Sequence, residues 1–121
     1  MRKILIIDDD EVYGELLLQR LEMAGYEVNF QRGPFGGSLL AARKGDVDLV
    51  IVDVNMPGLS GTALLDLIRK SEKRVPVILC SSMDKDALRA LSLRHGADAF
   101  LCKTATQAET LQCVSKVCRS H

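Results

Sequence analysis

Short apolar runs alternate along this chain with segments whose apolar residues recur at helical spacing. The runs predict strands at residues 4–7, 26–30, 49–53, 75–81 and 99–103. They are continuously apolar, which is typical of strands buried on both faces of a parallel sheet. The segments between and after them predict helices, among them 35–44, 62–70, 84–95 and 106–119. This order predicts an α/β domain of five βα units, with helices on both faces of the sheet.

The first helix has the clearest end signals. Asp10 is expected to cap its start, and Gly25 is expected to end it because glycine readily adopts positive φ. Apolar residues at helical spacing predict its buried face, which comprises Val12, Leu16, Leu17, Leu21 and Ala24.

Length and composition exclude several classes of function. At 121 residues with 47% hydrophobic positions, the chain is expected to form one domain with an ample core. Its 16 basic and 16 acidic residues balance, so no overall field favours nucleic acid or an anionic membrane. With 4% aromatic residues and no tryptophan, stacking on bases is also disfavoured.

The sequence shows no targeting signal, and its cysteines indicate no redox or metal-binding motif. The apolar run at residues 4–7 is too short for a signal peptide, and no run has membrane-spanning length, so we expect a cytoplasmic protein. The four cysteines form no Cys-x-x-Cys pair and are expected to serve as small buried or half-buried hydrophobic residues.

Polar side chains follow four of the predicted strands. Asp8 and Asp9 come after the first, Asp53 ends the third, Ser81 ends the fourth and Lys103 ends the fifth. A parallel sheet brings the carboxyl ends of its strands to one edge, so these side chains are expected to converge. Carboxylates held together need a cation, and oxygen ligands with few protein partners favour Mg²⁺.

This group of residues suits phosphoryl transfer. As a carboxylate beside a bound cation, Asp53 could attack phosphorus and form an aspartyl phosphate. Lys103 would supply a positive charge for the phosphate, and Ser81 a hydroxyl that can donate to it.

The ordered set of residues resembles the receiver domains of two-component response regulators, in particular the chemotaxis-type receivers. The resemblance covers the whole chain, residues 1–121, and implies a flavodoxin-like doubly wound sheet with strand order 2-1-3-4-5. It rests on Asp8-Asp9, Asp53, Asn55-Met56-Pro57-Gly58, Ser81-Ser82, Phe100 and Lys103.

The resemblance implies a division of roles among the acidic residues. Asp53 would accept a phosphoryl group from a histidine kinase or phosphotransfer protein. Asp9 would bind Mg²⁺ directly, Asp8 would act largely through metal-bound water, and Asn55 would contribute its backbone carbonyl. The protein would catalyse only its own phosphorylation and dephosphorylation, and would otherwise be no enzyme.

The resemblance also implies a switch. Lys103 would pair with the phosphate, Ser81 would move to bond it, and Phe100 would rotate inward; the alternative for Phe100 is an ordinary core aromatic. These movements would alter the surface of the fourth helix, fifth strand and fifth helix, and so control a partner protein or output domain. A phosphorylation-dependent dimer is compatible with this reading, and direct binding to nucleic acid or membrane is not expected.

The sequence departs from the family pattern at Thr104. Receivers usually carry a cis-proline directly after the lysine, whereas a non-proline cis bond costs about 3 kcal/mol. We therefore expect a trans bond after Lys103, a rearranged loop, and an altered face near the fifth strand and last helix.

The sequence is compatible with three other functions, each with weaker support. Residues 8–12 also fit the D-x-D-x-[TV] pattern of haloacid-dehalogenase-type phosphatases, with Asp8 as nucleophile, but Glu109 is the only acid after Lys103. A receiver-like interaction module that acts without phosphate would explain Thr104 but not the complete set of acids, hydroxyl and lysine. Flavin binding is disfavoured because no phosphate-binding glycine loop follows the first strand.

Overall fold

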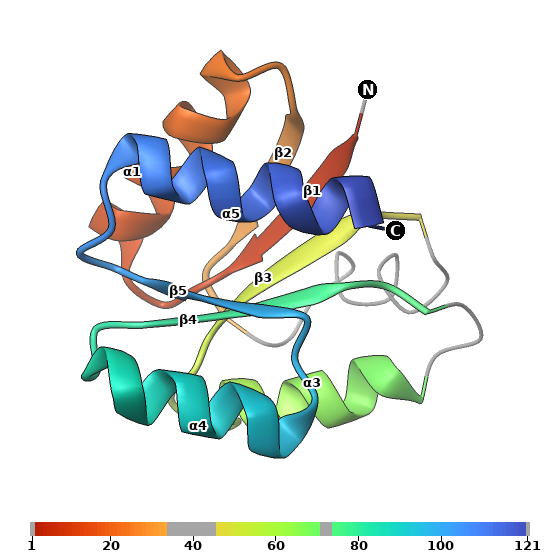
Figure 1. The fold of residues 1–121 in the computed structure, drawn as a ribbon, viewed down its shortest axis with the longest axis vertical. Coiled ribbons are helices and arrows are strands. Elements are labelled where there is room, and N and C mark those ends of the chain that lie inside the picture. Colours follow the sequence, from red (N-terminus) through yellow and green to blue (C-terminus); the bar gives the residue numbers. More distant parts are fainter. Residues whose placement is uncertain (1, 34–45, 71–73, 121) are drawn as a thin grey trace.

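The computed structural model describes residues 2–33, 46–70 and 74–120. It contains one parallel sheet in the order β2-β1-β3-β4-β5, which confirms the predicted fold class and strand order (Figure 1). The predicted helix at 35–44 lies outside the described residues. The elements are β1 (Lys3–Ile7), α1 (Glu11–Met23), β2 (Glu27–Gln31), β3 (Leu49–Asp53), α3 (Gly61–Arg69), β4 (Val77–Ser81), α4 (Lys85–His95), β5 (Ala99–Cys102) and α5 (Gln107–Ser120).

The sheet separates two apolar layers. Alternate residues of a strand point to opposite faces, so Ile4 and Ile6 pack with α1 and α5, whereas Leu5 and Ile7 pack with α3 and α4 (Figure 1). Both faces are covered by helices, and the inner strands β3 and β4 are buried at every position. This explains why the strand sequences are continuously apolar.

The predicted buried face of α1 is wrong in part. Leu17 and Leu21 are buried, but Val12 is 82% exposed, and Leu16 and Ala24 also face solvent. Tyr13 and Gly14 are buried instead. The reason is a close approach between α1 and the Phe30 side chain of β2: a Cβ at Gly14 would overlap the Phe30 ring, so a larger residue would fit only if that ring moved.

Helix ends follow the sequence signals. The Asp10 side chain accepts a hydrogen bond from the Tyr13 N–H at 3.1 Å, and so caps α1 as predicted. Gly25, predicted to end α1, has a φ of 95°, and Gly96, the C-cap of α4, has a φ of 71°. These left-handed conformations favour glycine because it carries no Cβ.

A charged network ties the amino-terminal edge of β4 and β5 to the neighbouring helices. Asp98 accepts hydrogen bonds from Arg69 at 2.7 Å, Arg74 at 2.8 Å and the Val77 N–H at 2.7 Å. Arg69 also donates to the carbonyls of Val75 and Gly96. The network therefore joins the end of α3, the start of β4 and the end of α4. These arginines hold the pKa of Asp98 below its ordinary value, against the effect of burial.

We predict that Asp98→Ala lowers the free energy of unfolding by about 3 kcal/mol, because it removes the carboxylate that neutralises Arg69 and leaves the Val77 N–H without its acceptor. Arg74 is 60% exposed, so Arg74→Ala should cost less than about 1 kcal/mol. Urea denaturation followed by circular dichroism measures both. Equal losses in the two variants would contradict the assignment of Asp98 as the centre of the network.

Candidate functional site

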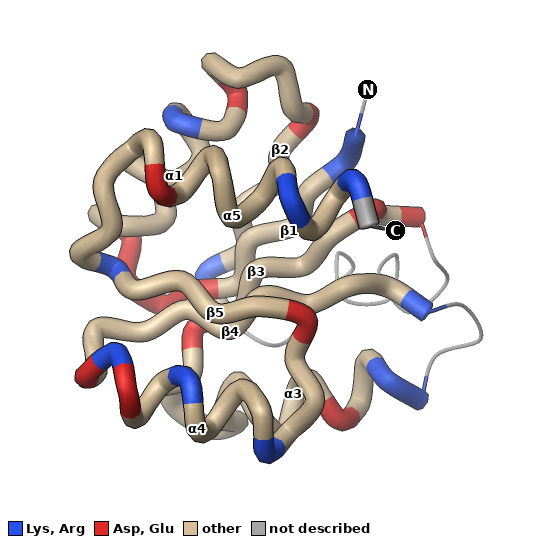
Figure 2. Tube along the Cα trace, in the orientation of Figure 1, with Lys and Arg blue, Asp and Glu red and all other residues tan. Residues whose placement is uncertain are grey.

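Three carboxylates meet at the carboxyl-terminal edge of the sheet. β1 and β3 are adjacent parallel strands, so the acids that follow β1 lie beside the acid that ends β3. One carboxylate oxygen from each of Asp8, Asp9 and Asp53 lies within 4.8 Å of the others, and we call these three residues the acidic cluster. Asp8 and Asp53 are buried, whereas Asp9 is partly exposed. Figure 2 shows acidic positions close together where β1 and β3 end.

Lys103 reaches this cluster from the end of β5. Its ammonium nitrogen lies 3.0 Å from Oδ2 of Asp8 and 3.6 Å from Oδ2 of Asp53. It also lies 3.8 Å from Oδ2 of Asp10. The lysine side chain is only 13% exposed, so water screens these attractions weakly.

The chain after Lys103 forms a tight turn in which the Ala105 N–H donates to the Cys102 carbonyl at 2.9 Å. The Lys103–Thr104 peptide is trans, as expected for a residue other than proline. The Lys103 N–H donates to the Ser81 carbonyl at 2.9 Å, which anchors the start of the turn to β4. The lysine thus points into the acidic cluster although Thr104 takes the usual place of a proline.

The pKa of Asp53 is strongly shifted by its surroundings in the cluster. Burial, and then the nearby charge of Asp8, raise the pKa of Asp53 to about 7, while Lys103 and the backbone N–H of Asn55 act in the opposite direction. A bound cation would stabilise the ionised form of this carboxyl group. Burial also raises the pKa of Tyr13 well above its ordinary value, so this phenol stays protonated and its ring neutral.

The residues present fit a hard divalent cation. Within the described part of the chain, Oδ2 of Asp8 is buried and accepts no hydrogen bond, although Lys103 lies 3.0 Å from it. The other oxygen, Oδ1, accepts from the Asp10 N–H at 2.8 Å and from Lys103 at 3.2 Å. A buried oxygen with free lone pairs beside two further carboxylates is the donor set that Mg²⁺ favours.

The loop after Asp53 folds tightly against it. The Val54 N–H donates to the Cys80 carbonyl, and the Gly61 N–H donates to the Val54 carbonyl, both at 2.9 Å. A Cβ at Gly61 would overlap the backbone carbonyl of Asp53. Glycine at the start of α3 therefore lets the helix close over the end of β3, which fixes the backbone of Asp53.

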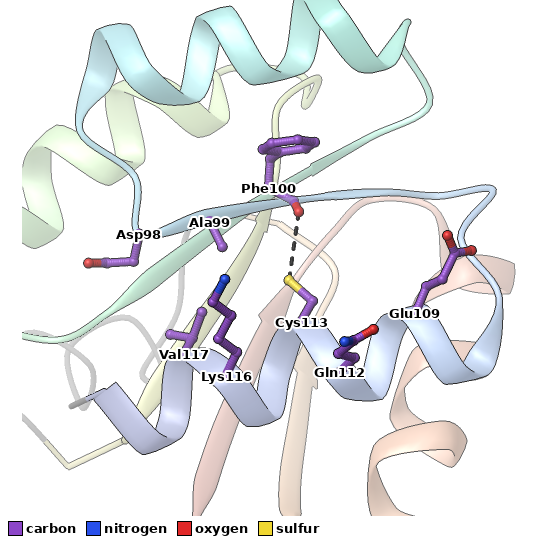
Figure 3. Close-up of a pocket in the computed structure, with 8 residues that line it drawn as sticks. All are labelled: Asp98, Ala99, Phe100, Glu109, Gln112, Cys113, Lys116 and Val117. Atoms are coloured by element: carbon purple, nitrogen blue, oxygen red, sulfur yellow. Dashed lines mark hydrogen bonds between the residues drawn. The ribbon is translucent and has the colours of Figure 1, made fainter.

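Ser81 ends β4, the strand next to β3, and Phe100 lies in β5 at the edge of the sheet. The fully buried Ser81 accepts a hydrogen bond at its Oγ from the Met83 N–H at 3.1 Å. Phe100 extends from β5 on the side of α4 (Figure 3), and the guanidinium of Arg89 lies 5.7 Å from its ring centroid. The structure therefore brings Asp8, Asp9, Asp53 and Lys103 together, whereas Phe100 lies on the outer α4–β5–α5 face.

Three contacts at the site were not predicted from the sequence. The ammonium of Lys103 lies 5.1 Å from the ring centroid of Tyr13, and the Cys80 thiol donates to the Tyr13 hydroxyl at 3.6 Å. Asp10, expected only to cap α1, also faces Lys103. The spacing of Tyr13, Leu17 and Leu21 marks an alternative buried face for α1, but no local pattern indicates a contact with Lys103.

The fold and the position of the charged residues define a flavodoxin-like α/β domain with a polyacidic site at the carboxyl ends of β1 and β3. Residues 4–115 match the family described as response regulator receiver domain, and the chain belongs to this family. It is a receiver domain of two-component response regulators, as the sequence predicts.

Individual relatives agree with this assignment. The chain is 32% identical over 117 residues to the transcriptional regulatory protein CusR of Escherichia coli strain K12, covering 97% of this chain and 51% of CusR. It is 34% identical over 118 residues to the uncharacterized transcriptional regulatory protein YkoG of Bacillus subtilis strain 168, covering 98% and 51%. The chain thus spans about half the length of these curated relatives.

Solved structures share the whole fold. A CheY-like receiver domain from Methanospirillum hungatei JF-1 is 27% identical with a TM-score of 0.86, and the match covers 99% of this chain and 95% of that one. The non-phosphorylated HemR receiver domain from Leptospira biflexa is 30% identical with a TM-score of 0.84, and the match covers 98% of this chain and 94% of that one.

None of the helices in the described residues combines the length and the apolar character that a membrane span requires.

We predict that Asp53→Asn stabilises the metal-free protein more at about pH 8 than at about pH 5. The pKa of Asp53 is raised on folding from 3.8 to about 7, so the folded chain binds an extra proton between these values and loses this stabilisation as the pH rises through 7. The advantage of the variant should grow by roughly 2 kcal/mol, since each pKa unit is worth about 1.4 kcal/mol and nearby water screens part of the effect.

Urea denaturation in chelator-treated buffer measures this difference, and added Mg²⁺ should reduce it. Asp66→Asn, at an exposed position of α3, is the control for simple loss of a negative charge. A pH-independent difference between Asp53→Asn and wild type would refute the perturbed titration of Asp53.

Proposed function

We propose that this receiver accepts a phosphoryl group on Asp53 in a Mg²⁺-dependent reaction and signals its presence through the α4–β5–α5 face. The observation that carries the proposal is the position of Lys103, whose ammonium lies 3.0 Å from Asp8 and 3.6 Å from Asp53. A cation held at this distance can neutralise charge on a phosphoryl group attached to Asp53.

The chemical step is a displacement at phosphorus. A carboxylate oxygen of Asp53 attacks the phosphorus of a phosphohistidine, the P–O bond forms, and the P–N bond breaks. The departing imidazole nitrogen keeps the electron pair and takes up a proton. When bound, Mg²⁺ would neutralise the oxygens of the transferring group and orient it. Asp9 and Asp8 would hold the ion with Asp53 and the Asn55 carbonyl, while Lys103 pairs with the phosphoryl oxygens.

The response to phosphorylation would begin at Ser81. Its hydroxyl now accepts from the Met83 N–H and would turn to donate to the phosphoryl group. Ser81 pairs with Cys102 in the sheet, and Phe100 lies two residues before Cys102. The Phe100 ring would move inward, away from its contact with Arg89. Phe100 lines two pockets on this face, one of about 440 Å³ (Figure 3) and one of about 480 Å³, and its movement would reshape both.

Partners follow from this scheme. The phosphoryl donor is a histidine kinase or phosphotransfer protein in the cytoplasm, and the target is a protein or output domain that docks on α4–β5–α5. The curated relatives are transcriptional regulators about twice the length of this chain, which supports an attached or separate output module. The receiver itself would contact neither nucleic acid nor membrane, and dimerisation through the same face is compatible with the scheme.

We predict that acetyl phosphate with Mg²⁺ phosphorylates wild-type protein on Asp53, and that Asp53→Asn abolishes this modification because the nucleophilic carboxylate is lost. Peptide mass spectrometry locates the phosphoryl group. Asp66→Asn is the matched control and should be phosphorylated like wild type. Phosphate on Asp8 would favour the dehalogenase-type alternative. An unmodified protein would favour an interaction module that acts without phosphate.

We also predict that Ser81→Ala is still phosphorylated on Asp53 but transmits the change poorly. The variant keeps the carboxylates and Lys103 and lacks only the hydroxyl that would report the phosphate. Amide NMR spectra recorded with and without acetyl phosphate measure the response of α4, β5 and α5. Undiminished shifts around Phe100 in phosphorylated Ser81→Ala would contradict the proposed route of the signal.

A further inference from the structure

The ammonium of Lys103 lies beside a neutral aromatic ring as well as beside charged groups. Three carboxylates surround it at 3.0 to 3.8 Å, and the ring of Tyr13 faces it with the centroid 5.1 Å away. An aromatic face attracts a cation through its quadrupole, most strongly where water is excluded. Both partners meet that condition, since Tyr13 is 7% exposed and the Lys103 side chain 13%.

Tyr13 is held at both of its ends. Its backbone N–H donates to Oδ1 of Asp10 in the cap of α1, and its hydroxyl accepts from the Cys80 thiol on β4. Asp10 in turn directs its other oxygen toward Lys103. The ring is therefore fixed between the first turn of α1 and the central part of the sheet, and it presents a rigid face to the ammonium.

A neutral aromatic face restricts the position of the lysine ammonium less than a carboxylate does. In the structure Lys103 is closest to Asp8, but pairing with a phosphoryl group on Asp53 requires it to leave Asp8. A cation bound at the acidic cluster would also repel the ammonium. A ring attracts the ammonium over a broad area and does not compete as an anion, so contact with Tyr13 can persist while the ion pairs exchange.

We propose that Tyr13 is a positioning residue for Lys103, whose aromatic face keeps the ammonium within reach of Asp53 during phosphoryl transfer. This inference rests on the proposed function of Asp53. It assigns the role to the ring and not to the hydroxyl, and it distinguishes Tyr13 from the purely apolar residues of the same layer, such as Leu17 and Val114.

The experiment compares variants at position 13 by the initial rate of Asp53 phosphorylation with acetyl phosphate and Mg²⁺. Tyr13→Phe keeps the ring and should keep the wild-type rate. Tyr13→Leu should be slower by about fivefold to thirtyfold, the range that corresponds to a cation–π contact partly to fully shielded from water. Val114→Ala, which removes buried apolar volume from the same layer on α5, controls for loss of packing and should leave the rate unchanged.

A trifluorinated phenylalanine at position 13 separates electrostatics from shape. Fluorine withdraws electron density from the ring face while the side chain remains aromatic, so the rate should fall toward that of Tyr13→Leu. The same variants are examined without phosphate or Mg²⁺ by carbon–proton NMR of the lysine side chain. The ε-methylene protons of Lys103 should show an upfield ring-current shift in wild type and Tyr13→Phe, and lose it in Tyr13→Leu.

The outcomes separate this inference from the proposed function. If wild type is phosphorylated on Asp53 and Tyr13→Leu or the fluorinated variant is equally fast, the role of Tyr13 is refuted and the proposed function stands. A Tyr13→Phe variant as slow as Tyr13→Leu would also refute it, because the hydroxyl would then be responsible. If wild type is not phosphorylated on Asp53, the proposed function fails and the positioning role fails with it, whatever the NMR shifts.

Discussion

The carboxyl-terminal edge of this sheet depends on the attraction between Lys103 and the acidic cluster. Two like charges 4 Å apart repel by about 4 kcal/mol at the effective dielectric typical of protein surfaces. Asp8 and Asp53 are buried with Asp9 beside them, so such repulsion would force the strand ends apart or neutralise a carboxyl group. The ammonium, 3.0 Å from Asp8 and 3.6 Å from Asp53, offsets part of this cost. The raised pKa of Asp53 reflects first its burial and then the repulsion from Asp8 that remains.

The architecture could be predicted from the sequence because it depends on local and periodic signals. The continuous apolar strands, the cap at Asp10 and the helix end at Gly25 are local signals, which do not depend on contacts with distant parts of the chain. The buried face of α1 could not be predicted in the same way. Val12 and Leu16 are as apolar as buried residues, but the helix is oriented by the fit of Gly14 against the ring of Phe30, a contact between two elements. The interactions of Asp98 likewise join residues from separate elements.

The members of the site were predictable for a different reason: a parallel sheet brings residues that follow its strands to one edge. Asp8, Asp9, Asp53 and Lys103 meet there. Which groups touch Lys103 was not predictable, since this depends on how a long side chain crosses the ends of β4 and β3. Residues from α1 complete its surroundings, with Asp10 and Tyr13 from the first turn. The substitution at Thr104 changes the peptide that follows Lys103 and does not remove the lysine from the cluster.

The two edges of the sheet differ in a way that bears on signalling. At the amino-terminal edge, Asp98 and Arg69 hold β4 and the end of α4 through the carbonyl of Gly96. At the opposite edge, α4 begins at its cap Asp84, three residues after Ser81, and the only hydrogen bond described for the Ser81 hydroxyl is with the Met83 N–H. A helix fixed at its far end and connected by a short segment to Ser81 responds most at its near end. If the Ser81 hydroxyl rearranges on phosphorylation as proposed, the change would therefore reach the start of α4 first, next to the turn that carries Lys103.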